Sequence, residues 1–140
     1  MTIEVVPQPR VDHLVTGLDG MQLRRTDHRG IVWFGGRQEA QAGTLVMRMQ
    51  TASISTPFWL PDTLAYHSAA ADRVLVSIVA SVLYVGEKSA LADVSARLAV
   101  NDNHPAVSHV LVHIRGAARV PLGVSYEVTV LAPLDAIATS

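Results

Sequence analysis

Two stretches near the C-terminal end of the chain alternate between apolar and polar residues with a period of two. In His109–Arg115, three apolar side chains share one face of an extended strand (Val110, Val112 and Ile114). In Val124–Leu131 the pattern returns with Val124, Tyr126, Val128 and Val130. A period of two is typical of a strand with one buried and one wetter face. Gly116 and a turn at Pro121–Gly123 separate the stretches, so they predict an all-β fold, an antiparallel β-sandwich or flattened barrel.

The size and composition of the chain predict one domain that contacts other proteins. At 140 residues it has the length of a single domain, which we place at residues 13–140. The hydrophobic fraction is 49% and the charged fraction only 16%, so we expect some apolar surface to be buried against other copies or other proteins. The net charge of −1 offers no field to attract nucleic acid or an anionic membrane, and neither is expected as a partner.

Neither the N-terminal residues nor the longest apolar run predicts export or a membrane span. The first ten residues lack a basic start followed by an apolar core, so no secretory signal peptide is expected. The longest apolar run, Val74–Val85, is interrupted by two serines and is shorter than the ~20 residues of a membrane helix. This run is rich in β-branched residues and apolar on both faces. It therefore predicts a central strand that is covered on each side.

Residues 1–12 predict an extended N-terminal arm ahead of the domain. Three of them suit a strand (Ile3, Val5 and Val6), and Pro7 and Pro9 then stop a ladder of hydrogen bonds from continuing. Such a segment can bury its side chains and satisfy its backbone only at a sheet edge, of its own chain or of a neighbour. Because the prolines favour a segment held away from its own body, we expect a neighbouring copy to provide that edge.

The middle of the chain predicts short elements. An Asp-Gly pair indicates a hairpin turn, and a run of Asn, Asp and Pro after residue 100 indicates another. The expected elements are a turn at Gly17–Gly20, a charged loop at Arg24–Gly30, short strands at Ile31–Phe34, Thr44–Gln50 and Val94–Val100, a helix at Thr63–Asp72 capped by Asp62, and a turn at Asn101–Pro105.

Pro57–Asp62 predicts an aromatic loop that includes Phe58 and Trp59, with Tyr66 nearby. Aromatic rings in such a loop suit stacking on a sugar ring or anchoring a protein partner. The alternative is that Phe58 and Trp59 close one end of the sandwich, because large aromatic residues are mostly buried. In either case we expect the loop to meet the core or another chain.

No pattern in the chain predicts catalysis, a metal or a cofactor. There is no cysteine and no serine in a nucleophile elbow. His109 and His113 share a strand face but lie about 13 Å apart, too far to bind one metal ion. Asn101-Asp102-Asn103 lacks the remaining ligands of a calcium loop and predicts a turn stabilised by an Asn side chain. We therefore expect a protein that is not an enzyme and holds no cofactor.

Two resemblances follow from these features. The Met1–Asp12 arm, the β-rich body and the missing active-site motifs resemble small virion proteins of tailed bacteriophages, of the minor tail or capsid decoration type. Separately, Ser55-Thr56-Pro57-Phe58 and Val124-Ser125-Tyr126-Glu127-Val128 are similar to small lectin sandwiches of the H type. The first resemblance implies a non-enzymatic structural subunit of a phage virion, in contact with its own copies and other virion proteins. The second implies a carbohydrate-binding module that uses Phe58, Trp59 and Tyr66.

Overall fold

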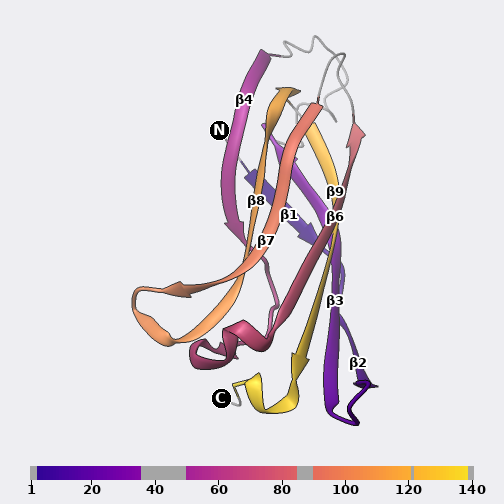
Figure 1. Cartoon of the computed structure of the whole chain (residues 1–140). Coiled ribbons are helices and arrows are strands. Elements are labelled where there is room, and N and C mark those ends of the chain that lie inside the picture. Colours follow the sequence, from indigo (N-terminus) through magenta and orange to yellow (C-terminus); the bar gives the residue numbers. More distant parts are fainter. Residues whose placement is uncertain (1–2, 36–49, 85–89, 121, 139–140) are drawn as a thin grey trace.

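The chain folds into two antiparallel sheets packed face to face (Figure 1). A computed structural model describes residues 3–35, 50–84, 90–120 and 122–138, and strands dominate these segments. The predicted all-β sandwich is thus confirmed. The strand predicted at Thr44–Gln50 lies almost entirely outside the described residues.

Sheet A has four positions across its width. One edge is shared by β1 and β2, which pair end to end along β3, and β9 and β6 follow in that order. The bounds are β1 Ile3–Pro7, β2 Val11–Thr16, β3 Gln22–Phe34, β9 Leu122–Pro133 and β6 Leu75–Tyr84.

Sheet B is built around β8, the longest strand. β7 pairs with one edge of β8, and β4 and the two-residue β5 pair with the other. The bounds are β8 His104–Val120, β7 Ala90–Asn101, β4 Gln50–Trp59 and β5 Tyr66–His67. Two short 3-10 helices, η1 at Ser68–Arg73 and η2 at Leu134–Ala136, lie at one end of the sandwich.

The N-terminal segment belongs to the sheet of its own chain. Ile3–Pro7 pairs antiparallel with β3, from Ile3 opposite Phe34 to Pro7 opposite Gly30, and the Gln8 amide donates to the Arg29 carbonyl at 2.8 Å. The expectation that a neighbouring copy provides this edge is wrong. Residues 11 and 12 are the start of β2, so the predicted boundary after residue 12 falls inside a strand. Pro7 ends the edge strand β1 and Pro9 lies in the connection to β2, so a missing amide donor costs little at either position.

The predicted charged loop at Arg24–Gly30 is wrong, because β3 is one continuous strand of 13 residues. Its inward face runs through Thr26, His28, Gly30, Val32 and Phe34, which are all buried. Arg25, Asp27 and Arg29 alternate on the outward face, where Arg25 and Arg29 meet water. The period of two therefore continues from the apolar part of the strand into its polar part.

The core lies between the two sheets and follows the predicted alternation. The apolar residues on the inward faces of β8 and β9 are fully buried, as expected (Val110, Val112, Ile114, Val124, Val128 and Val130). Tyr126 is buried among them and meets Phe58 of the facing sheet edge to face, with 6.3 Å between ring centroids. Such aromatic pairs add specific geometry to the burial of apolar area.

The predicted central strand at Val74–Val85 is an edge strand. β6 pairs with β9, and among the described residues no strand pairs with its other side. Val76 and Ile78, which we expected to be nearly fully buried, face the core but are only half-buried. Leu75 and Val79 point outward and are 65% and 71% exposed. The sequence of β6 is typical of a strand covered on both faces, but in the described part of the chain its outer face is exposed.

The connection between β4 and β6 differs from expectation, whereas two predicted turns do not. The helix expected at Thr63–Asp72 is replaced by β5 and η1, and His67 precedes η1 without any side-chain cap. The two predicted turns are confirmed. Gly20 has a φ of 81°, and the Asn101 side chain accepts a hydrogen bond from the Asn103 amide at 3.0 Å.

Candidate binding surfaces

Phe58 and Trp59 lie in β4 and point to opposite faces of sheet B. The predicted aromatic loop is therefore wrong, because the strand continues to Trp59, opposite Leu111 of β8. Phe58 faces inward and is buried, whereas Trp59 faces outward and is 47% exposed. Tyr66, the third predicted aromatic, is 1% exposed in the core. Of the six predicted binding residues, only Trp59 is exposed, while Ile3, Val5 and Val6 are partly buried in β1.

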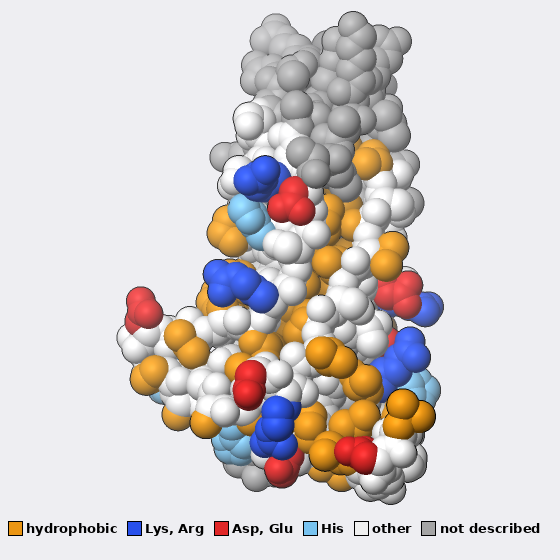
Figure 2. Space-filling model, viewed as in Figure 1, with side chains coloured by type: hydrophobic (Ala, Val, Ile, Leu, Met, Phe, Trp, Pro, Cys, Tyr) orange, Lys and Arg blue, Asp and Glu red, His pale blue; other side chains and the backbone are white. Residues whose placement is uncertain are grey.

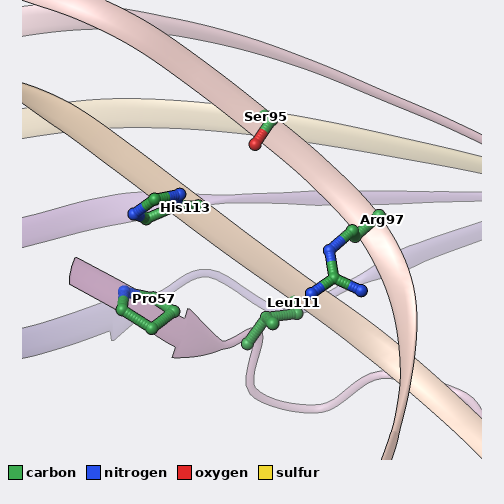
Figure 3. A pocket seen from close by; sticks show the side chains of 5 residues that line it. All are labelled: Pro57, Ser95, Arg97, Leu111 and His113. Atoms are coloured by element: carbon green, nitrogen blue, oxygen red, sulfur yellow. The ribbon is translucent and has the colours of Figure 1, made fainter. Parts of the chain in front are cut away.

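A hollow of about 260 Å³ lies on the outer face of sheet B. Three neighbouring strands line it: β4 with Pro57, β8 with Leu111 and His113, and β7 with Ser95 and Arg97 (Figure 3). The His113 ring is held by its Nε2, which lies 3.2 Å from the Ser55 hydroxyl. The hollow thus combines an apolar floor with hydrogen-bonding groups.

The Trp59 ring lines a second hollow, of about 190 Å³. Its lining joins the ring to Leu60, Thr63, Asn101 and His109. A half-exposed ring at a hollow with amide, hydroxyl and imidazole groups can stack on a flat apolar face and hydrogen-bond to hydroxyl groups. His109 and His113 face the same side of β8, as predicted, with Leu111 between them.

The end of the β2–β3 hairpin exposes a group of large apolar side chains, which we call the hairpin-end surface. It consists of Leu14, Val15, Leu18 and Met21, all exposed. The hairpin projects beyond sheet B (Figure 1), so Leu14 points toward the inner side without a facing sheet to cover it. Figure 2 shows hydrophobic side chains at this end of the molecule, over β2, β3 and the start of β6.

The hairpin-end surface borders a broad hollow of about 500 Å³. Leu18, Met21 and Leu23 line one side of it, and Arg73 and Pro133 line the other. Arg73 is fixed at the rim by Asp135, with 3.1 Å between Nη1 and Oδ1. The surface therefore has an apolar centre with a charged border, which is the usual anatomy of a protein–protein contact.

A buried polar cluster lies next to the hairpin, on the inner side of β3. The Thr26 hydroxyl, His28 Nε2 and the Tyr66 hydroxyl are buried, with no hydrogen-bond partner among the described residues. Burial lowers the pKa of His28 and raises the pKa of Tyr66 to about 12. Buried polar atoms of this kind usually bind ordered water. Sequence reasoning missed the cluster because it placed Thr26 and His28 in a solvated loop.

Charged residues close the mouth of this cluster. Asp12 accepts hydrogen bonds from Arg10 Nε at 3.2 Å and from Arg24 Nη2 at 2.9 Å. Arg10 also donates to the Asp62 carbonyl oxygen at 3.0 Å. Burial alone would raise the pKa of Asp12, but the hydrogen bond and the charge of Arg24 outweigh it, and the pKa is lowered. The charged side chains are thus paired with one another, and they stabilise the packing at this end of the sandwich.

The described residues include no group of three or more His, Asp or Glu side chains arranged to hold a metal ion. Within the same segments, every helix is too short to cross a membrane. A comparison with protein-family models, curated proteins and solved structures found no match to this chain.

Proposed function

We propose that this protein is a non-enzymatic structural subunit of a large assembly, a phage virion, in the role of a minor tail or capsid decoration protein. The observation that carries the proposal is the hairpin-end surface, where Leu14 is 69% exposed and Leu18 is fully exposed. Its partners in this proposal are copies of the chain and other virion proteins. The phage assignment itself rests on the sequence resemblance.

The energetic argument concerns the apolar area that the hairpin leaves in water. Burying a single Leu or Met side chain is worth about 1.5–3 kcal/mol. Leu14, Leu18 and Met21 together therefore represent a free energy comparable to a substantial share of a domain's stability. A group of large apolar side chains exposed at one end of the molecule suits a contact with another protein. The long strands behind it give the hairpin a rigid support for such a contact.

The proposal is tested by following the chain into purified particles. The double variant Leu14→Asp, Leu18→Asp removes the apolar character of the hairpin-end surface without touching the core. The matched control is Val100→Asp, an exposed valine at the far end of β7. We expect the double variant to be depleted from particles and the control to be incorporated like the original chain. Equal incorporation of all three would overturn the role of this surface.

A second candidate function, carbohydrate binding, is favoured by one observation, the half-exposed Trp59 ring that lines a hollow with Thr63, Asn101 and His109. In this alternative the ring stacks on a sugar, and Arg97 and Asn101 bind its hydroxyl groups. Phe58 and Tyr66 are buried and contribute only through packing.

A glycan array distinguishes this alternative. The original chain is expected to bind a defined group of glycans, Trp59→Ala is expected to lose them, and Leu18→Ser, on another surface, is expected to keep them. An array without any bound glycan would overturn the alternative, as would a Trp59→Ala variant with unchanged binding.

A further inference from the structure

The edge of sheet A formed by β6 differs from every other edge in the described part of the chain. Its ten residues, Leu75–Tyr84, include no charged residue and no proline. The β1–β2 edge contains Pro7 and Asp12, the β7 edge contains Asp93 and Arg97, and β4 contains Pro57. Charges and prolines are the usual devices that keep an edge strand from pairing with another chain. β6 lacks them.

The side chains of β6 are incompletely buried on both faces. Val76 and Ile78 face the core but remain half-buried, and Leu75 and Val79 on the outer face are 65% and 71% exposed. A run of β-branched and apolar residues is typical of a strand that is covered on both faces. In Figure 1, β7 curves away from β6 toward the β7–β8 hairpin, so sheet B leaves the first half of β6 open.

We propose that β6 pairs antiparallel with β6 of a second copy of this chain, around a two-fold axis, and so joins two copies of sheet A into one continuous sheet. Charge determines the choice of partner. A two-fold pairing sets each edge against itself, and β6 has no charge to repel its own copy. Pairing of β6 with any other edge of a second copy would place uncharged apolar residues beside a proline or a charged side chain.

The alternation along β6 also suits pairing with itself. Directly opposite residues in an antiparallel pair point to the same face, so outward residues meet outward residues. On β6 these are Leu75, Ser77, Val79 and Ser81, in which large apolar and small polar side chains alternate. The outer side chains of the pair would cover one another, and the half-buried Val76 and Ile78 would gain neighbours on their open side.

This contact forms between two copies in dilute solution and needs no other protein. It is therefore separate from the hairpin-end surface. A chain that is monomeric but still enters particles overturns the β6 pairing and leaves the proposed function standing. A dimeric chain that never enters particles does the opposite.

The first test is the mass of the purified full chain in solution by light scattering. We expect twice the chain mass of 15.0 kDa, and the mass of one chain for Val79→Lys, which places a charge on the edge. The matched control is Val100→Lys, at an exposed valine of β7, which is expected to remain a dimer. A monomeric original chain, or a Val79→Lys variant that is still dimeric, would overturn the proposal.

The second test locates the contact, and the absence of native cysteine makes it clean. Single variants Ser77→Cys, Val79→Cys and Ser81→Cys place one thiol at successive outward positions of β6. At least one of them lies near the two-fold axis and is expected to form a disulfide-linked dimer under mild oxidation. Ser95→Cys, on the outer face of sheet B, is the control and is expected not to. A dimer that none of the three positions cross-links would contradict pairing through β6.

Discussion

The Tyr126 hydroxyl occupies the space above Gly30, directly opposite it in the β3–β9 ladder. A β-carbon built on Gly30 would lie 2.5 Å from that hydroxyl oxygen and 2.7 Å from the Val6 carbonyl oxygen. Three residues along the same ladder, on the outer face, the Trp33 ring covers Gly123 in the same way, with a closest distance of 2.8 Å. The two central strands of sheet A are thus fitted together by one aromatic–glycine pair on each face.

This fit predicts that Gly30→Ala destabilises the fold more than Gly123→Ala. The added methyl group at Gly30 meets a backbone carbonyl that cannot move freely, whereas at Gly123 it meets a side chain. We expect a loss of about 1–3 kcal/mol at Gly30, typical of overpacking. Chemical denaturation measures the free energy of unfolding. Gly17→Ala, with its nearest neighbour at 3.2 Å, is the control and should cost less.

Removal of residues 1–7 is expected to lower the melting temperature of the chain itself. β1 pairs with β3 along five residues and covers Val32 and Phe34 at the sheet edge. Its loss exposes that edge and the core beneath it. Thermal unfolding followed by circular dichroism checks this outcome. An unchanged melting temperature would mean that β1 contributes nothing to its own domain.

Truncation of the two neighbouring aromatic residues of β4 is expected to lower stability by unequal amounts. Phe58→Ala removes a buried ring that contacts Tyr126 and should cost about 3–5 kcal/mol. Trp59→Ala removes a half-exposed ring from the outer face and should cost clearly less. Denaturant unfolding of both variants provides the comparison. Equal losses would contradict the opposite orientation of the two side chains.

Acidification is expected to destabilise the fold through His28. Burial and the nearby Arg10 charge lower the pKa of His28 below its ordinary 6.5, so the unfolded chain takes up a proton at a higher pH than the folded chain. The free energy of unfolding therefore falls as the pH drops below about 6.5. Asp12 and Asp27, whose pKa values are also lowered, reduce stability only below about pH 4.

Unfolding curves recorded between about pH 7 and pH 5 isolate the histidine contribution. His28→Leu is expected to flatten the dependence of stability on pH over this range. His104→Asn, at the exposed start of β8, is the control and is expected to leave the slope unchanged. An identical slope in His28→Leu would show that His28 takes up its proton equally well in the folded chain.

The sequence predicted the sandwich because alternation on β8 and β9 follows directly from a buried and a wetter strand face. It failed at β3, where Arg24, Arg25 and Arg29 suggested a loop although the same period of two continues through Thr26 and His28. Charged residues on the outward face of a strand do not interrupt it.

The position of a strand within a sheet could not be predicted from its own residues. β6 has the composition of a central strand, yet in one chain it forms an edge. The N-terminal segment was predicted to pair with a neighbouring copy but forms an edge of its own sheet. Pro7 and Pro9 are compatible with either position. Of the three aromatic residues predicted for the candidate site, Trp59 is exposed and Phe58 and Tyr66 are buried. That difference depends on which face of each strand meets the core.

The most direct test of the structural-subunit proposal is density-gradient fractionation of a native lysate, with the chain quantified in every fraction by mass spectrometry. We predict that the chain migrates with dense particles, in a constant ratio to the major particle protein across the peak. A chain found only in the light fractions, at its own small mass or as a dimer, would contradict the proposal.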